Sequence, residues 1–213
     1  PLTPKKGSLG RLVPYFEAEL DRAGVTLVHK EAHAAELGGY DGVVVATGAA
    51  PRVPDIPGLE RYRWADLLAD DELPRDKHVL VIGGGLVGVD VATALIPRGN
   101  RITIVKRTED FGEDMEMIAK KLSLKMMREA GTTFSDRTHI ERIDGGTVHA
   151  KRDGESVRFE AVDLIVVSTG MKSLDALAAE LEGALPVYVV GDAHRVGNAR
   201  TAIEEGYLTA REL

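Results

Sequence analysis

Three glycines at the spacing Gly-x-Gly-x-x-Gly are the residues of this chain best suited to contact a ligand. They are Gly83, Gly85 and Gly88, and they follow an apolar run. Gly85 lets a pyrophosphate approach the backbone, Gly83 permits a tight turn, and Gly88 lets a helix pack closely on a strand. A helix starting here would direct free N–H groups and a positive dipole at the phosphates. The motif predicts a dinucleotide-binding turn that includes Leu86 and Val87.

Two cationic residues lie at the position that discriminates between NAD(H) and NADP(H) in dinucleotide-binding folds. Lys106 follows an apolar run, eighteen residues after Gly88, and Arg107 is next to it. An acidic residue at this place would bond the adenosine ribose 2′-hydroxyl and favour NAD(H). Lys106 and Arg107 instead suit the 2′-phosphate of NADP(H). The other interpretation is a pair of solvated surface charges.

A short segment occurs twice. Residues 40–48 align without gaps on residues 162–170, and each copy has an aspartate, an apolar run and then Thr-Gly. The matched ends are Thr47-Gly48 and Thr169-Gly170. The recurrence indicates two related nucleotide-binding units, the second inserted into the first. Coincidence between two valine-rich strands is the alternative.

Gly191 and Asp192 follow the last apolar run of the chain. A carboxylate at the carboxyl end of a parallel strand suits a hydrogen bond to a polyol hydroxyl. Asp192 is equally well explained as the N-cap of the following helix.

Catalytic and metal-binding patterns are not evident. The chain has no cysteine, so thiolate metal sites and redox-active dithiols are excluded for its own residues. His29 and His33 are four residues apart without a supporting carboxylate, and no Ser/His/Asp arrangement can be identified. The acidic residues Glu109, Asp110, Glu113 and Asp114 are expected to favour the first turn of the next helix.

The elements that would position these residues alternate between strand and helix. Apolar spacing predicts helices over Leu9–Ala23, near Val87–Leu95, over Met115–Glu129 and near Arg200–Arg211. Pro51, Pro54 and Pro57 predict a crossing linker. Asp-Gly pairs within 138–160 predict a small antiparallel meander. Strands are expected at Val25–Val28, Gly42–Gly48 (running into a glycine turn), His78–Ile82, Arg101–Val105, Asp163–Ser168 and Val187–Val190.

Composition limits the class of protein. The chain has 213 residues and a net charge of −7 with both signs interspersed, so we expect no nucleic-acid partner. The apolar runs are strand-length, shorter than the ~20 residues of a membrane span. Without a secretory signal, the sequence predicts a cytoplasmic protein.

The order of these motifs resembles the flavoproteins with two dinucleotide-binding domains. The closest similarity is to the C-terminal region of the NADH:flavin oxidoreductases fused to an old yellow enzyme barrel, such as 2,4-dienoyl-CoA reductase and trimethylamine dehydrogenase. The residues that carry it are Val-Val-Val-Ala-Thr-Gly48, Val-Ile-Gly83-Gly-Gly85-Leu-Val-Gly88, Ser-Thr-Gly170 and Val-Val-Gly191-Asp192-Ala.

The resemblance implies a relay in which NAD(P)H passes hydride to FAD. Electrons would continue through an iron–sulfur cluster to FMN in the barrel. By position, Gly83, Gly85 and Gly88 would hold the nicotinamide dinucleotide. Thr47 and Gly48 would lie beside FAD, and Asp192 would bond its ribityl chain. Gly170 and Gly191 belong to the same cofactor-binding motifs.

The sequence departs from this family in what it lacks. Residues 1–40 contain no FAD-type Gly-x-Gly-x-x-Gly, and no iron–sulfur cysteines or barrel are present. We therefore expect a piece of a larger protein, inactive alone, whose partners are the missing flavin and iron–sulfur domains. The expected fold is a three-layer Rossmann-like α/β FAD/NAD(P)-binding fold with a small meander. Residues 73–172 would form the inserted NAD(P) domain, and 1–72 with 173–213 an incomplete FAD-type domain.

Two other functions remain open at this point. One is a non-catalytic module that binds ADP or another nucleotide for a structural or docking role. The other is an independent dehydrogenase, which would need a proton-transfer residue that the sequence does not offer.

Overall fold

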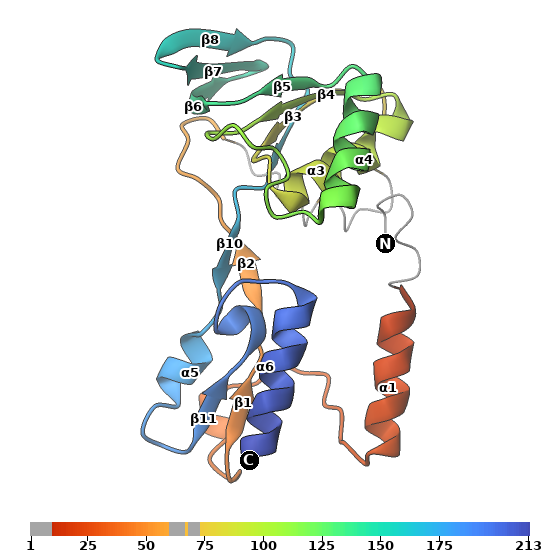
Figure 1. Cartoon of the computed structure of the whole chain (residues 1–213). Coiled ribbons are helices and arrows are strands. Elements are labelled where there is room, and N and C mark those ends of the chain that lie inside the picture. Colours follow the sequence, from red (N-terminus) through yellow and green to blue (C-terminus); the bar gives the residue numbers. More distant parts are fainter. Residues whose placement is uncertain (1–9, 60–66, 68–72) are drawn as a thin grey trace. The chain divides into compact units, whose positions relative to one another are not determined.

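The computed structural model describes residues 10–59, 67 and 73–213 (Figure 1). Contacts divide the chain into two compact units. Unit 1 contains Pro51–Gly170, and unit 2 contains Phe16–Ala50 and Met171–Leu213. Each unit is therefore made of its own set of strands and helices, and each is described by itself below.

A four-stranded parallel sheet forms the centre of unit 1. Its order is β5 (Thr133–Ser135), β4 (Arg101–Val105), β3 (His78–Ile82) and β9 (Leu164–Val167). All neighbouring pairs are parallel. All five residues of β3 are buried, because a central parallel strand is covered on both faces. The expected strands at these positions are confirmed, and β5 is an addition.

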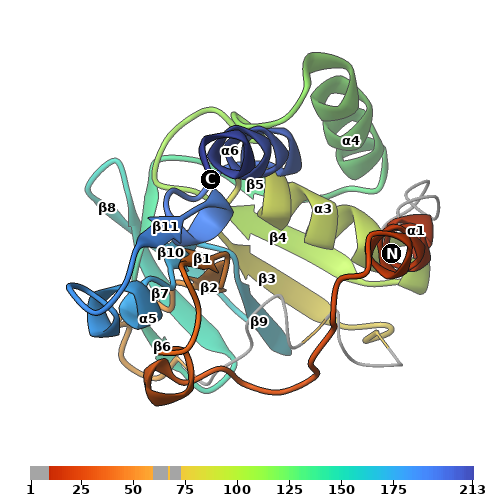
Figure 2. The same cartoon turned by 90° about the horizontal axis from the view of Figure 1, so that it is seen from below.

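Helices cover one face of this sheet and a meander covers the other (Figure 2). Val79 and Val81 of β3 belong to the apolar cluster shared with α3 (Leu86–Leu95) and α4 (Met117–Glu129). Leu80 and Ile82 belong to a second cluster with the meander. Residues of β3 alternate between the two clusters because successive side chains of a strand point to opposite faces of the sheet. The predicted three-layer α/β class is confirmed.

The meander consists of three antiparallel strands. They are β6 (Thr138–Asp144), β7 (Thr147–Arg152) and β8 (Glu155–Phe159). The proline-rich segment packs on them, since Ile143 donates its N–H to the Pro57 carbonyl at 2.8 Å. Ile56 and Leu59 lie against the same apolar cluster. The segment therefore belongs to unit 1.

The described part of unit 2 contains two short sheets, two α-helices of its own and residues 16–22 of the helix Leu12–Arg22. The parallel pair is β1 (Val43–Val45) with β11 (Val187–Val189). The other pair is β2 (Ala49–Pro51) with β10 (Met171–Ser173). The helices are α5 (Ala176–Glu180) and α6 (Ala199–Glu212). β10 and α5 were not expected from the sequence.

One predicted element is wrong. Val25–Val28 is irregular, although its sequence is typical of a strand. Val28 is 64% exposed, and a strand needs a hydrogen-bonded neighbour that this segment does not have within the described residues. The preceding helix is confirmed as α1 (Leu12–Arg22). The predicted start of that helix at Leu9 lies outside the described residues.

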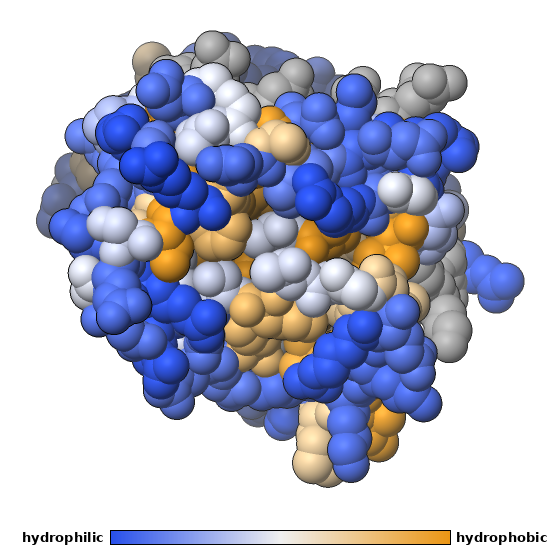
Figure 3. All heavy atoms as spheres, turned by 90° about the horizontal axis from the view of Figure 1, so that it is seen from above, coloured by the Kyte–Doolittle hydropathy of each residue, from blue (hydrophilic) through white to orange (hydrophobic). Residues whose placement is uncertain are grey.

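No helix within the described ranges is long and apolar enough to cross a membrane. On the face drawn in Figure 3 hydrophilic side chains predominate, with apolar ones between them. Exposed apolar side chains are spread over several elements, among them Leu12 and Phe16 of α1, Ile118 and Leu122 of α4, and Ile203 and Tyr207 of α6.

Candidate nucleotide-binding site

Steric exclusion explains two glycines of the motif. Gly83 directly follows β3 and has φ +110°, and a Cβ atom there would lie 2.2 Å from the Ser168 carbonyl oxygen. A Cβ atom at Gly88 would lie 1.9 Å from the Gly83 carbonyl oxygen. Both distances are far below van der Waals contact. Gly83 and Gly88 are therefore required to form the turn and to pack α3 against it.

Gly85 has a different environment. It is the N-cap of α3, with an extended conformation that other residues also adopt. A Cβ atom there would meet no atom closer than the Asp114 carboxylate oxygen, at 3.5 Å. The protein itself leaves this position open, at the end of a helix whose first N–H groups have no partners within it. Leu86 is exposed and Val87 lies against the core.

Gly84 holds the loop after β4 in place. The Gly112 N–H donates to the Gly84 carbonyl at 2.7 Å. A Cβ atom at Gly84 would lie 2.5 Å from the ring of Phe111, which is buried in the core cluster. Sequence reasoning missed this contact. The only feature of the sequence that could have indicated this contact was Phe111, an aromatic residue within an acidic stretch.

Ser168 is a second residue that sequence reasoning missed. It follows β9 and is buried. Its N–H donates to the Ile82 carbonyl at 2.8 Å, and its hydroxyl donates to the Gly83 carbonyl at 2.9 Å. These bonds fix the backbone at the start of the glycine turn. Its place just before Thr169 in the repeated segment was the available signal.

Lys106 is held by its own loop. It follows β4, and its ammonium lies 2.8 Å from the Glu113 carboxylate. The same ammonium donates to the Asp110 carbonyl at 2.6 Å, and its side chain is only 10% exposed. Arg107 is exposed. Lys106 and Arg107 are thus at the end of the second strand, as expected, in two different environments.

The acidic residues of this loop mostly pair with cations. Glu109 lies 2.9 Å from Arg137, and Asp110 lies 2.5 Å from Lys120. The expectation that they favour the first turn of α4 is wrong for Glu109, which pairs outside this helix, whereas Asp110 contacts the start of α4 through Lys120. Glu116 caps the helix instead.

The Glu116 carboxylate accepts the N–H groups of Ile118 and Ala119 at 2.9 and 3.0 Å. These two backbone hydrogen bonds lower the pKa of Glu116. The helix therefore begins with a charge-assisted cap.

The two repeated segments have matching local structures. Gly48 and Gly170 both adopt positive φ, +75° and +100°. In unit 2 the Thr47 hydroxyl donates to the Leu174 carbonyl, and the Leu174 N–H donates to Gly48. In unit 1 the Thr169 hydroxyl donates to the Arg52 carbonyl, and the Arg52 N–H donates to Gly170. This correspondence supports a true internal repeat over coincidence.

Asp192 organises the turn that precedes α6. Its carboxylate accepts the Gly197 N–H at 2.9 Å. The N-cap of α6 is Asn198, whose side chain accepts the Thr201 N–H, so the alternative that Asp192 caps this helix is wrong. The Ser173 hydroxyl donates to the Asp192 carbonyl at 2.7 Å. Ser173 is the last residue of β10, and Leu174 follows it. Since Leu174 bonds Gly48, the end of β10 is hydrogen-bonded to both Asp192 and Gly48.

Gly191 is bonded to α6. Its N–H donates to the Glu205 carboxylate at 2.7 Å. The other oxygen of Glu205 lies 3.1 Å from His194. The hydrogen bonds from His194 and then from Gly191 lower the pKa of Glu205. Gly191 itself has φ +63°, and the turn after β11 depends on it.

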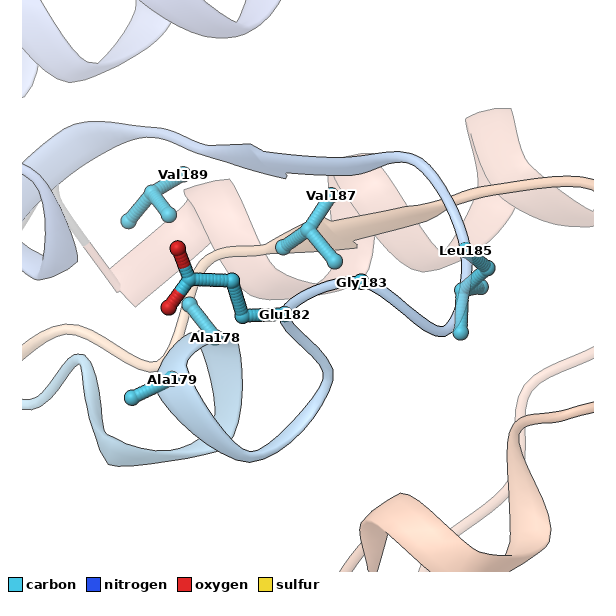
Figure 4. A pocket seen from close by; sticks show the side chains of 7 residues that line it. All are labelled: Ala178, Ala179, Glu182, Gly183, Leu185, Val187 and Val189. Carbon is cyan, nitrogen blue, oxygen red and sulfur yellow. The ribbon is translucent and has the colours of Figure 1, made fainter.

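Two surface hollows are lined by none of the predicted site residues. One, of about 400 Å³, is lined by α5, the segment after it and β11 (Figure 4). Its only charged lining residue is Glu182. The other, of about 350 Å³, lies beside Phe111 and Phe134. Within the described ranges no group of histidines, aspartates and glutamates has the arrangement of a metal site.

One protein family and several known proteins are similar to this chain. The profile of the family described as pyridine nucleotide-disulphide oxidoreductase matches residues 12–206. An NADH oxidase of Thermoanaerobacter brockii is 29% identical over 99% of this chain and 34% of its own length. A bilirubin reductase of Mediterraneibacter gnavus is 28% identical, also over 99% of this chain and 34% of its own length.

A solved structure of 2-naphthoyl-CoA reductase is similar in fold. Its TM-score is 0.85 at 26% identity, covering 97% of this chain and 32% of that one. The chain thus spans about a third of the length of these relatives.

Proposed function

Because the chain belongs to the pyridine nucleotide-disulphide oxidoreductase family, we propose that unit 1 binds NAD(P)H at the turn Gly83–Gly88. Proteins of this family use NAD(P)H and FAD as cofactors. In the complete enzyme the bound nicotinamide supplies hydride to FAD. The proposed role of this chain is that of the pyridine-nucleotide part of an NAD(P)H:flavin oxidoreductase.

The open position at Gly85 carries the proposal. It lies at the N-terminus of α3, where the helix dipole favours an anion. Gly83 and Gly88 have steric reasons to be glycine, whereas Gly85 has none within the protein. A diphosphate close to the backbone supplies the missing reason. Leu86 and Val87 would contribute first-turn N–H groups to it.

The protein's own residues hold this turn rigid. Ser168 bonds the Gly83 carbonyl, and Gly112 bonds the Gly84 carbonyl. Lys106 and Arg107 would flank the adenosine ribose at the end of β4. Such a site contributes position and electrostatics to hydride transfer, and it needs no acid–base residue of its own.

The second cofactor is assigned to unit 2. We propose that Thr47, Gly48, Gly191 and Asp192 belong to the turns beside FAD, and that Gly170 belongs to the corresponding cofactor-binding motif of unit 1. Residues 73–172 would form the NAD(P) domain together with the proline-rich segment 51–59, which packs on the meander, and the rest of 1–72 with 173–213 would form part of an FAD-type domain. A flavin and iron–sulfur portion, supplied by the rest of the parent protein, would complete the relay.

Isothermal titration of the purified chain with NADH, NADPH and ADP tests the proposal. We expect a nicotinamide dinucleotide to bind more tightly than ADP. Equal affinities for ADP and for both dinucleotides would favour a structural ADP-binding module. Absence of binding by all three would overturn the proposal.

The visible absorption spectrum of the same preparation tests the second cofactor. We expect less than stoichiometric FAD, because the chain has no FAD-type glycine turn in its first 40 residues. Stoichiometric FAD would contradict the view that this part of the flavin site is incomplete.

A further inference from the structure

The carboxylate of Glu113 pairs with Lys106, the residue that directly follows β4. Lys106 follows the last residue of the strand, and its ammonium holds Glu113 at 2.8 Å. The Glu113 side chain is 48% exposed, compared with 10% for Lys106. The solvent therefore meets an acidic group at this place before it meets the cation.

The backbone of Lys106 is equally well fixed. Its N–H donates to the Ser135 carbonyl, and its carbonyl accepts the Thr138 N–H, both at 2.9 Å. Its ammonium has a second acceptor in the Asp110 carbonyl. Lys106 is thus a half-buried anchor for the loop, and its charge is compensated by Glu113.

The loop around this pair is strongly acidic. Residues 107–116 contain five carboxylates and one cation, Arg107. Glu109 and Asp110 pair with Arg137 and Lys120, and Glu116 caps α4. Of the other two, Glu113 pairs with Lys106, and a carboxylate oxygen of Asp114 lies 3.5 Å from the position of a Cβ atom at Gly85.

A hydroxyl and a phosphate would meet this arrangement differently. A ribose 2′-hydroxyl can donate a hydrogen bond to an exposed carboxylate, as acidic residues at this strand end do. A 2′-phosphate would face Glu113 at close range, and like charges brought together oppose binding. Arg107 is the one exposed cation of the loop that could compensate.

We infer that Glu113, positioned by Lys106, makes the site selective for NADH over NADPH. The inference rests on the proposed function and supplies its cofactor. It reverses the preference that Lys106 and Arg107 suggest in the sequence, because Lys106 acts on Glu113 instead of on the ligand. The loop after β4 thus supplies an acidic side chain, Glu113, beside Lys106, where the sequence itself has no acidic residue.

The test is a set of titrations of the full chain with NADH and with NADPH. Wild type is expected to bind NADH more tightly. Glu113→Gln removes the repulsion but keeps a hydrogen-bond acceptor. The affinity for NADPH should therefore rise about tenfold, which is the size expected for one interaction with a charged group. Glu109→Gln is the matched control, since it removes a charge from the same loop at the Arg137 pair.

Lys106→Met separates the two roles of the lysine. If Lys106 positions Glu113, the variant loses NADH affinity and the preference shrinks. If Lys106 binds a 2′-phosphate, the variant loses NADPH affinity selectively, which would overturn the inference. Circular dichroism and thermal unfolding of each variant show whether it is folded.

The outcomes also separate this inference from the proposed function. Binding of NADPH by wild type as tightly as NADH or more tightly, or an unchanged preference in Glu113→Gln, would overturn the inference alone. No binding of either dinucleotide would overturn the proposed function and the inference with it.

Discussion

Gly85 and Gly88 belong to one motif but serve different purposes. Gly88 has no space for a side chain, because the Gly83 carbonyl oxygen occupies the position of its Cβ atom. Gly85 has space and an ordinary backbone conformation. At the scale of single residues, the glycine turn therefore divides into positions needed for folding and a position needed for a ligand.

This difference predicts opposite results for two substitutions. Gly88→Ala should lower the free energy of unfolding by roughly 1–3 kcal/mol, as expected for overpacking. Gly85→Ala should leave stability nearly unchanged and weaken the binding of NADH. Urea unfolding and isothermal titration measure the two effects. A Gly88→Ala protein as stable as wild type, or a Gly85→Ala protein that binds NADH with wild-type affinity, would contradict this division of the two glycines.

The loop between β4 and α4 is the element that links the glycine turn to the end of the second strand. Phe111 and the Gly112 N–H fasten it to Gly84, and Lys106 fastens Glu113 to β4. Glu116 then begins α4 as its N-cap. Three kinds of contact, apolar, backbone and ionic, therefore fix one short segment.

The cap gives α4 a stability that depends on pH. Backbone hydrogen bonds lower the pKa of Glu116, so its folded pKa is below the unfolded value of about 4.3. Its stabilising contribution is present above that value and is lost as the pH falls through the lowered folded pKa. Glu116→Gln should therefore destabilise the chain near neutral pH and lose this effect in acid.

Urea unfolding of wild type and Glu116→Gln at several pH values measures this dependence. Glu160→Gln is the control, because Glu160 is exposed and lies outside any helix. A difference between wild type and Glu116→Gln that stays constant down to acid pH would contradict the role of the carboxylate as a charged cap.

At the scale of the whole chain, burial is uneven. Every residue of β3 is buried, and the first cluster joins it to β4, α3 and α4. By contrast, α1 and α6 have no buried residue. Helices packed so little gain little from apolar burial, so most of the stability must come from the sheet of unit 1.

Hydrogen exchange should follow this distribution. We expect the amides of β3 and β4 to exchange most slowly and those of α1 to exchange fastest among the helices. Exchange measured by mass spectrometry on the full chain would show it. Protection of α1 equal to that of β3 would mean that another surface covers α1 in solution.

Local patterns in the sequence determined much of this fold. The apolar runs of β3, β4 and β9, the spacing of the three glycines and the Asp-Gly turns of the meander depend on neighbouring residues, so they could be predicted. The repeated Thr-Gly segments were also visible, and their matching bonds confirm the correspondence. Composition and motif order were sufficient for the α/β class and for the broad pyridine-nucleotide flavoprotein family, while the narrower resemblance to the barrel-fused enzymes stays a prediction.

Only the tertiary structure decided which groups meet. Val25–Val28 has the residues of a strand, but strand formation requires a hydrogen-bonded neighbour, and the described chain provides none. Lys106 seemed free to bind a phosphate, yet the loop folds back and places Glu113 against it. A charge can be read from the sequence, whereas its partner depends on how the chain returns through space.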